Sequence, residues 1–532
     1  MGEIVEPRTL SGFMELLPKD QVIFEKIKSE MEKVYQKYGF YPIDTPILED
    51  SRILLAKAGG ETEKQVYRFN KGDSDLTMRF DLTVPLAKYV AKNYGELTFP
   101  FRRYQIGKVY RGERAQKGRF REFYQADIDI IGDGKLSIVN DAEIPSIIYN
   151  LFKNLGIDNF VIRINNRKVL NGLFDNFGVK DSAVEILRTI DKIDKIGRDN
   201  VAKELVELNV QEATVNELLD ILTFDGSNDE KVEKLNSFAG CNEVFDAGLL
   251  ELTTVINYIA GFGVPSDYYK IDLSIARGLD YYTGTVYETF IKGHPEYGSV
   301  CSGGRYDNLA EYYTKKSLPG VGISIGLTRL FYVLCENEFL NREIECPIDA
   351  LVVPMTDDMT YAVKTATALR AADINTQIYL EEGKFKKKLT YGSRLTIPFC
   401  IILGSDEIDA NQVTIKNMNT GEQKTTDLQD AISIINSQKE LLKKANNKEA
   451  YDEIADEIFK LREQREKCTV DTAARDAQIA RINELQDFIK QQPAHLEAFD
   501  EALVKRWLER IIVWEDHFTV ELKSGLKIDI EG

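Results

Sequence analysis

Residues 101–132 read FRRYQIGKVYRGERAQKGRFREFYQADIDIIG, and this is the most informative segment of the chain. The side chains from Tyr104 to Tyr110 follow the period-two alternation that is typical of a β-strand. A charged segment, Glu113–Gly118, separates them from a second aromatic and apolar run that begins at Phe123. Two strand-like runs around a polar loop predict a long antiparallel hairpin.

Six of the residues from 101 to 121 are arginines. Alternate residues of a strand share one face, so Arg111 and Gln125 are expected to project into a common cleft. The planar guanidinium group binds two phosphate oxygens at once and stays charged, which indicates a phosphate site. Asp127 and Asp129, close by in the sequence, are candidates to hold a cationic group. A solvated, charge-rich hairpin without a ligand is the alternative that these residues leave open.

Three more segments mix polar and aromatic residues in the same way. In MRFDLTVP (78–85), Asp81 and Thr83 are two residues apart, and we expect both on the same face of a strand. The other two segments are ARGLDYYTGTVYE (276–288) and SGGRYDNL (302–309), and the latter begins with a predicted glycine-rich turn.

Residues 320–330 read GVGISIGLTRL. The glycine spacing does not match the dinucleotide-binding fingerprint, and the chain has no Walker-type G-x-x-x-x-G-K-[ST]. We interpret these glycines as allowing close backbone approach in a strand beneath a ligand. A helix is predicted to follow from Thr328 to Glu336.

The chain has 532 residues, too many for one ordinary domain. Residues 1–340 are predicted as the first domain, with a helical insertion at about 170–263. Strands alternating with helices predict a small α/β domain at 346–437. Residues 439–492 contain no proline or glycine and carry apolar residues at helical spacing. The tail, 438–532, is therefore predicted as a helical coiled-coil hairpin followed by a β-hairpin.

The composition excludes several classes of protein. A hydrophobic fraction of 43% is too high for a collagenous or wholly disordered chain. A net charge of −18 argues against a protein whose whole surface coats nucleic acid. The six cysteines form no C-x-x-C pair and there are three histidines, so neither zinc nor a disulfide framework is expected. No leader pattern and no apolar run of about 18 residues is present, so we expect a cytoplasmic protein without a membrane segment.

Taken together, the segments resemble those of histidyl-tRNA synthetase, a class II aminoacyl-tRNA synthetase, over about residues 1–437. YRGER…RFREFYQ is similar to motif 2, GVGISIGLTRL to motif 3 and GFYPIDTP (39–46) to the degenerate motif 1. RGLDYYTG and SGGRYDNL resemble two segments peculiar to the histidine enzyme. The resemblance implies an α+β catalytic core, with an antiparallel sheet flanked by helices, and an α/β anticodon-binding domain.

The resemblance also implies how histidine would be bound. Asp81, Thr83 and Gln125 match the residues that hold its α-ammonium group, and one carboxylate with two neutral acceptors suits three N–H donors. Asp129 and Tyr282 match the pair that reads the ring nitrogens. Asp81 and Asp129 stand where many bacterial members carry glutamate. The full set implied for histidine is Asp81, Thr83, Gln125, Asp129, Tyr281, Tyr282 and Tyr306.

For ATP, the resemblance implies that Arg111 contacts the α-phosphate, that Phe123 stacks on adenine and that Arg329 lies near the γ-phosphate. Arg277 matches the arginine that replaces a catalytic metal beside the α-phosphate, so Arg111 and Arg277 are the implied catalytic residues. Glu113 completes the implied ATP-binding set. Mg²⁺ is expected only with the nucleotide, bridging its outer phosphates, with no metal site made by the protein alone and no prosthetic group.

The implied function is that of a histidine–tRNA ligase, which joins L-histidine and ATP to histidyl-adenylate and transfers the histidine to the 3′ end of tRNA(His). A homodimer is the expected assembly. Five basic residues of the α/β domain suit tRNA phosphates: Lys384, Lys386, Lys387, Lys388 and Arg394. The alternative is a histidine-sensing regulatory subunit of ATP phosphoribosyltransferase, which charges no tRNA and lacks the module at 347–437.

Residues 438–532 lie outside this resemblance and carry 16 Lys and Arg against 21 Asp and Glu. Their end, from residue 502 onward, weakly resembles the C-terminal region of large serine recombinases but comes without the recombinase catalytic domain. We expect no recombinase chemistry from it. A fused remnant or chimaeric gene model and a dimer-stabilising or partner-binding coiled coil are the alternatives left open.

Overall fold

The computed structural model describes residues 4–56, 64–114, 118–190, 192–275, 282–336, 346–445 and 501–531. It forms two compact units, Met1–Pro347 and Ile348–Gly532, which are treated separately below. The predictions for Arg277 and Tyr281 lie outside the described residues, and so does the part beyond residue 445 of the helical hairpin predicted at 439–492.

The first unit is built on an eight-stranded sheet of order β1-β5-β6-β11-β10-β9-β7-β8. Its centre is the predicted hairpin, because β5 (Phe101–Tyr110) and β6 (Glu122–Ile131) pair antiparallel along their whole length. Only the outer pairs, β1 with β5 and β7 with β8, are parallel. The remaining strands are β1 (Tyr41–Pro42), β7 (Phe160–Asn166), β8 (Tyr269–Ile271), β9 (Thr285–Ile291), β10 (Cys301–Tyr306) and β11 (Gly320–Gly326).

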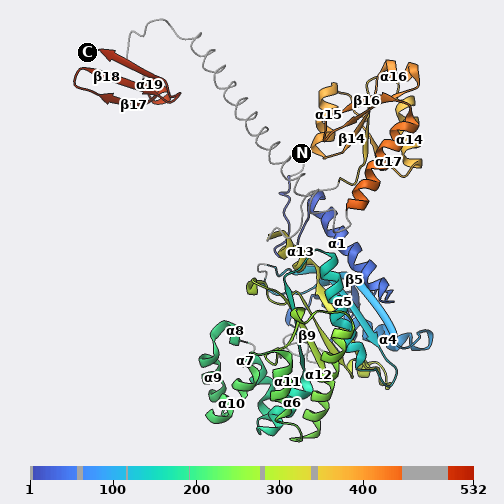
Figure 1. Ribbon diagram of the computed structural model, residues 1–532, viewed down its shortest axis with the longest axis vertical. Helices are drawn as coiled ribbons and strands as arrows, with labels where there is room; N and C mark the ends of the chain where they lie inside the picture. Colours follow the sequence, from blue (N-terminus) through green and yellow to red (C-terminus); the bar gives the residue numbers. More distant parts are fainter. Residues whose placement is uncertain are drawn as a thin grey trace. The chain divides into compact units, whose positions relative to one another are not determined.

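Alternation along β6 gives the sheet two different faces. Ala126, Ile128 and Ile130 are fully buried in a core that also contains residues of the flanking helices. The opposite face of the same strand carries Gln125, Asp127 and Asp129. The predicted antiparallel sheet flanked by helices is confirmed (Figure 1). The helices that pack around it are α1 (Pro18–Lys37), α4 (Thr83–Lys92), α5 (Val139–Asn154) and α13 (Leu327–Glu336).

Between β7 and β8 the chain is helical, as predicted for the insertion, and these helices gather beside the sheet (Figure 1). Its last helix packs against α5 and joins the same hydrophobic core. The insertion contains α6 (Arg167–Asn176), α7 (Ala183–Ile190), α8 (Ile193–Ile196), α9 (Arg198–Glu207), α10 (Glu212–Leu222), α11 (Asn228–Asn236) and α12 (Glu243–Gly261). A separate three-stranded sheet of order β2-β4-β3 comprises β2 (Leu48–Asp50), β3 (Arg68–Lys71) and β4 (Ser74–Met78).

Two local predictions were wrong. Residues 302–305 form part of the central strand β10 rather than a turn. Glycine is required there because a Cβ atom at Gly304 would lie 2.5 Å from the carbonyl oxygen of Thr285 on the neighbouring strand. Thr83 does not lie on a strand but begins helix α4, and Asp81 Oδ1 accepts the backbone N–H of Val84 at 3.1 Å. This local hydrogen bond favours the start of a helix over an extended chain.

The second unit contains the predicted α/β domain, with a five-stranded sheet of order β13-β12-β14-β15-β16. Strand β12 pairs in parallel with both neighbours, whereas β15 and β16 are antiparallel. Its strands are β12 (Ala350–Pro354), β13 (Thr376–Ile378), β14 (Phe399–Leu403), β15 (Val413–Asn417) and β16 (Gln423–Thr426), and its helices are α14 (Thr360–Ala371), α15 (Phe385–Arg394), α16 (Ser405–Ala410) and α17 (Leu428–Ala445).

Helix α17 runs beyond residue 437, where the domain was predicted to end. Lys439, on its last turns, donates to Asp349 Oδ2 at 2.8 Å and to the carbonyl oxygen of Asp373 at 2.7 Å. These contacts tie the end of α17 to the α/β domain.

From residue 501 onward, the described part of the tail is a short helix followed by strands. The predicted β-hairpin is present, and a third strand extends it into an antiparallel sheet of order β17-β18-β19. Its elements are α19 (Glu501–Trp507), β17 (Leu508–Val513), β18 (His517–Leu522) and β19 (Lys527–Glu531).

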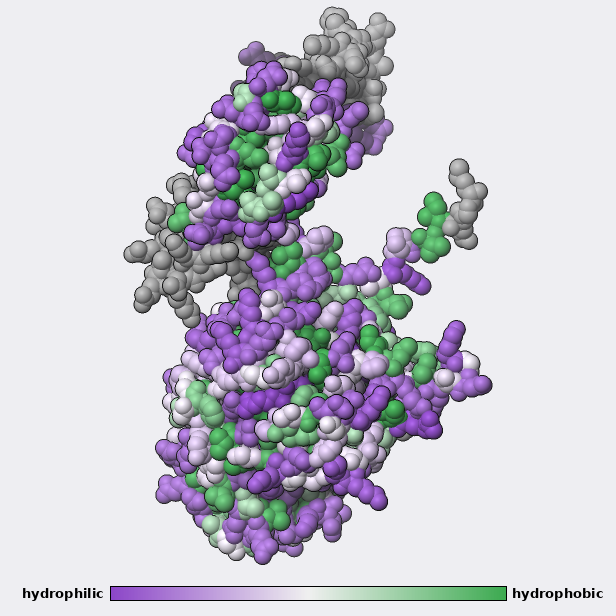
Figure 2. All heavy atoms as spheres, turned by 90° about the vertical axis from the view of Figure 1, so that its right-hand side faces the viewer, coloured by the Kyte–Doolittle hydropathy of each residue, from purple (hydrophilic) through white to green (hydrophobic). Residues whose placement is uncertain are grey.

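The described helices include none that combines the length and apolar character needed to cross a membrane. On the face drawn in Figure 2, hydrophobic residues are scattered among hydrophilic ones, as is usual for a water-exposed surface.

Candidate active site

A cavity of about 580 Å³ opens over the polar face of β6 and is also lined by residues of β10 and β11. All of the predicted site residues that the structure describes line it: Asp81, Thr83, Arg111, Glu113, Phe123, Gln125, Asp129, Tyr282, Tyr306 and Arg329. They come from segments far apart in the sequence and meet in one place. Arg277 and Tyr281 lie outside the described residues.

One part of the cavity presents acceptors that have no partner. Asp81 Oδ2 and Gln125 Oε1 are buried, and neither has a hydrogen-bond partner among the described residues. Burial raises the pKa of Asp81 to about 6, although Arg111 and Arg103 oppose the shift. Buried acceptors left unpaired are costly, so this arrangement fits a ligand that brings a cationic N–H donor.

Asp129 is held on both sides by the protein. Tyr306 donates its hydroxyl to Asp129 Oδ1 at 2.7 Å, and Arg103 Nη2 lies 2.5 Å from Oδ2. A Cβ atom at Gly322, directly opposite on β11, would clash with this carboxylate, so glycine makes room for it. Burial raises the pKa of Asp129 above its ordinary value, and Arg103 opposes that shift.

Arg103 is a site residue that the sequence reasoning missed. Its side chain is fully buried, and it lies opposite Asp129 in the β5–β6 register. Arg103 is also close to Asp81 and Asp127. Burial raises the pKa values of these two carboxyl groups, and the positive charge of Arg103 opposes that rise. Arg103 could have been predicted from its place in the hairpin. It lies on the same face as Gln125 and Asp129, and a buried arginine needs a carboxylate partner.

Arginines gather in another part of the cavity. Arg111 Nε donates to a backbone carbonyl at 2.9 Å, and its guanidinium carbon lies 5.2 Å from the centre of the Phe123 ring. Arg329 donates to two backbone carbonyls at 2.8 and 3.2 Å. Burial first, and then the like charges of Arg119 and Arg111, lower the pKa of Arg329. Cations that disfavour one another's charge in this way fit an anionic ligand such as a phosphate chain.

Two carboxylates, Glu113 and Glu288, also line the cavity. Within the described ranges, no group of three or more His, Cys, Asp or Glu side chains is placed to hold a metal ion. Mg²⁺ commonly uses one or two carboxylates together with substrate phosphates. This donor set therefore fits Mg²⁺ that arrives with a nucleotide.

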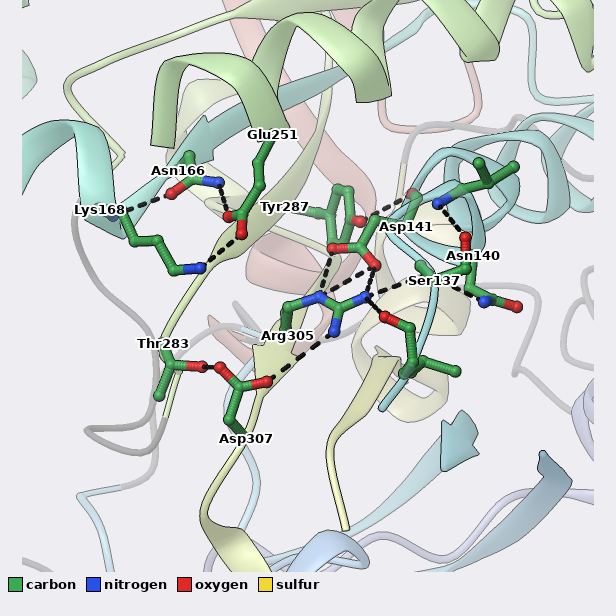
Figure 3. A network of polar contacts seen from close by, with 12 residues as sticks. Ser137, Asn140, Asp141, Asn166, Lys168, Glu251, Thr283, Tyr287, Arg305 and Asp307 are labelled. Atoms are coloured by element: carbon green, nitrogen blue, oxygen red, sulfur yellow. Dashed lines mark hydrogen bonds and ion pairs between the residues drawn. The ribbon is translucent and has the colours of Figure 1, made fainter. Parts of the chain in front are cut away.

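A buried ion pair supports the wall that carries Tyr306 (Figure 3). Arg305 Nη2 lies 2.7 Å from Asp141 Oδ1, and Arg305 Nε lies 3.0 Å from Oδ2. Thr283 donates its backbone N–H to the carbonyl oxygen of Arg305 at 2.8 Å and its hydroxyl to Asp307 at 2.6 Å. These contacts join helix α5, strand β10 and the segment just before β9.

Comparisons with known proteins identify the family of this chain. The family model "Histidyl-tRNA synthetase" matches residues 12–330, and "Anticodon binding domain" matches residues 349–438. A histidine–tRNA ligase of Clostridium tetani is 56% identical over 434 residues, with 81% of this chain and 99% of the relative covered. A histidine–tRNA ligase of Finegoldia magna is 49% identical over 429 residues, with 81% of this chain and 99% of the relative covered.

Among solved structures, histidyl-tRNA synthetase from Nostoc sp. PCC 7120 is 38% identical, with a TM-score of 0.75, and 82% of this chain and 100% of that chain are covered. The family model for the catalytic region spans more than half of the chain. The chain therefore belongs to the histidyl-tRNA synthetase family.

Proposed function

We propose that the cavity is the place where this chain, acting as a histidine–tRNA ligase, joins L-histidine to ATP. The observation that carries the proposal is that a single cavity combines unpaired buried acceptors, at Asp81 and Gln125, with a cluster of arginines around Arg329. An ammonium group suits the acceptors and a triphosphate suits the arginines. The reaction needs both ligands side by side.

On the histidine side, Asp81, Thr83 and Gln125 would accept the three N–H bonds of the α-ammonium group. Asp129 would accept from the imidazole ring, and Tyr282 lines the same cavity. Both oxygens of Asp129 are already held by Tyr306 and Arg103, so its position is fixed before histidine arrives. A side chain without an N–H donor would leave the remaining acceptor position of this buried carboxylate unfilled, which would favour histidine over other amino acids.

On the ATP side, Arg111 would contact the α-phosphate, Phe123 would stack on adenine, and Glu113 and Arg329 would face the outer phosphates. The carboxylate oxygen of histidine attacks the α-phosphorus, and the bond from phosphorus to the bridging oxygen breaks, which releases pyrophosphate. Arg111 would stabilise the charge that spreads over the α-phosphate oxygens, and Arg277 is proposed for the same task. Mg²⁺ that arrives with ATP would neutralise charge on the phosphates, and Glu113 and Glu288 are cavity carboxylates that would help to hold it.

A ribose hydroxyl at the 3′ end of tRNA(His) would then attack the carbonyl carbon of histidyl-adenylate and release AMP. The α/β domain would bind the anticodon region through exposed basic residues, namely Lys384, Lys386, Lys387 and Arg394. Lys388 does not belong to this surface, which corrects the prediction. It is 6% exposed, and its Nζ donates to the carbonyl oxygen of Pro354 at 2.6 Å.

The function is tested by histidine-dependent exchange of pyrophosphate into ATP. We expect exchange with histidine alone among the amino acids, and its loss in Arg277→Ala. Histidine binding without exchange would instead support the regulatory subunit of ATP phosphoribosyltransferase. A homodimer in the cytoplasm is proposed with the ligase, and sedimentation equilibrium would give the assembly state.

For the tail, we propose a passenger segment that resembles the end of a large serine recombinase and takes no part in charging. A chain ending at residue 445 keeps the whole of helix α17 and is expected to charge tRNA(His) at the full-length rate. A chain ending at residue 437 loses the contacts of Lys439 with Asp349 and Asp373, and a lower thermal unfolding midpoint is expected. Slower charging by the longer truncation product would contradict the passenger role.

A further inference from the structure

The segment around Gly12 lies against the end of the hairpin formed by β5 and β6. The carbonyl oxygen of Gly12 accepts the backbone N–H of Arg121 at 2.7 Å and that of Glu122 at 3.3 Å. Arg121 also pairs across the hairpin, because its carbonyl oxygen accepts the backbone N–H of Arg111 at 2.9 Å. These bonds join a distant segment of the chain to the place where the loop between the two strands begins and ends.

The side chain of Arg121 bridges this loop and the segment around Gly12. Its Nε donates to the carbonyl oxygen of Glu113 at 3.0 Å, and its Nη1 donates to that of Ser11 at 3.3 Å. A guanidinium group can hold two carbonyl groups at once because its N–H donors form a rigid, planar array. Glu113 lines the cavity, whereas Arg121 is not among the described residues that do. Arg121 therefore holds the loop from outside the cavity.

Glycine is required at position 12 for two reasons. Its φ is +84°, a backbone conformation that residues with a Cβ atom rarely adopt. A Cβ atom there would also lie 2.8 Å from Cγ of Arg121. Any other residue would therefore strain the backbone and push the arginine side chain away from the loop.

The part of the loop next to Arg121 carries charged groups of the cavity. Glu113 and Arg119 both line the cavity, and Glu113 Oε2 lies 4.0 Å from Arg119 Nη1. On the other side of the same stretch, the backbone N–H of Gly112 donates to the carbonyl oxygen of Gln65 at 2.6 Å. The backbone beside Glu113 is thus fixed from two sides, and with it the position of a carboxylate among the arginines.

We infer that Arg121 is a positioning residue, which together with Gly12 holds Glu113 and Arg119 where they face the phosphates of ATP. The inference rests on the proposed function of the cavity. It gives Arg121 no contact with ATP or histidine, since its hydrogen bonds go to the loop and to the segment around Gly12. Loss of its side chain is therefore expected to weaken ATP binding and to leave the histidine part of the cavity intact.

The test is calorimetry of the full-length protein with ATP and Mg²⁺, in the absence of histidine. We expect Arg121→Ala to raise the Kd for ATP about 10-fold, as for the loss of one hydrogen bond made by a charged group. Arg121→Lys is expected to recover part of this loss, because an ammonium group can still donate to one carbonyl oxygen but lacks the planar array. Gly12→Ala is expected to raise the Kd for ATP as well, because the added methyl group displaces the Arg121 side chain.

Gly156→Ala is the matched control for Gly12→Ala. Gly156 also has a positive φ, +75°, but a Cβ atom there would meet nothing within 4 Å. We expect Gly156→Ala to bind ATP with wild-type affinity, so that backbone strain alone is separated from the effect on Arg121. Thermal unfolding monitored by circular dichroism checks that each variant folds.

Two readouts separate positioning from a general loss of structure. The Kd for L-histidine, measured by calorimetry without ATP, is expected to stay within about twofold of the wild-type value in Arg121→Ala. The double variant with Gly12→Ala is expected to raise the Kd for ATP by less than the product of the two single effects, because both changes disturb one contact.

An unchanged Kd for ATP in Arg121→Ala, equal losses for ATP and histidine, or a double effect equal to the product of the single ones would overturn the inference. If wild-type protein bound ATP but exchanged no pyrophosphate in the presence of histidine, the proposed function would fail, while the ATP affinities would still test the role of Arg121. Wild-type protein that bound no ATP would overturn both.

Discussion

Replacement of Arg111 by alanine is expected to slow histidine-dependent ATP–pyrophosphate exchange by about 10²–10³-fold, the usual cost of one preorganised donor to developing charge. Arg111 is held ready for this task, because its Nε is bonded to a backbone carbonyl at 2.9 Å and its guanidinium group lies over the Phe123 ring. The other guanidinium nitrogens remain to meet phosphate oxygens. The loss is expected in kcat for exchange as well as in the KM for ATP.

Arg111→Lys should be compared with Arg111→Ala, because lysine keeps the positive charge but lacks the planar guanidinium group. We expect it to recover only a small part of the lost rate. Arg52→Ala is the matched control, because Arg52 is an exposed arginine of the same unit that pairs with Asp50 and does not line the cavity. Normal exchange by Arg111→Ala, with normal KM for ATP, would remove Arg111 from the proposed site.

Replacement of Arg305 by methionine is expected to lower the free energy of unfolding by about 3–5 kcal/mol, because the carboxylate of Asp141 would stay buried without its partner. Asp141 is fully buried and Arg305 is 5% exposed, so water cannot replace the lost contact. The pair joins helix α5 to strand β10, which carries Tyr306 (Figure 3). Urea denaturation followed by circular dichroism measures the loss.

The effect of Arg305→Met on the free energy of unfolding is also expected to depend on pH, and the direction of that dependence is a second test. Burial already raises the pKa of Asp141, and loss of Arg305 removes the hydrogen bonds that oppose this shift. A folded pKa above the unfolded one means that the folded state binds more protons, so unfolding free energy falls as pH rises. We expect the loss of unfolding free energy caused by Arg305→Met to be smallest at acidic pH and largest at pH 8. Arg52→Met, which breaks an exposed pair, should cost at most about 1 kcal/mol at either pH.

The sequence carried much of the fold because its strongest patterns are local. Alternation from residue 101 to 131 predicted the hairpin, and the same alternation separated the core face of β6 from its polar face. The insertion at about 170–263 was predicted to be helical, and it contains helices α6 to α12. Local reasoning was wrong at residues 302–305, because two glycines in a row resemble a turn unless the strands on both sides are known.

The secondary structure predicted around Asp81 was also wrong. Spacing of two residues suggested that Asp81 and Thr83 share a strand face, yet Asp81 accepts the N–H of Val84 and a helix begins at Thr83. Both side chains still line the cavity. The residue types were therefore enough to nominate the site, although the backbone that presents them was different.

The family resemblance, the alternating hairpin and ten of the side chains that line the cavity could be predicted from the sequence. Which buried charges compensate one another could be known only from the folded chain. Arg305 and Asp141 are 164 residues apart, and Arg103 reaches Asp129 only through strand register. Such pairs form because a charge removed from water needs a partner, and which partner lies within reach depends on folding, not on spacing along the chain.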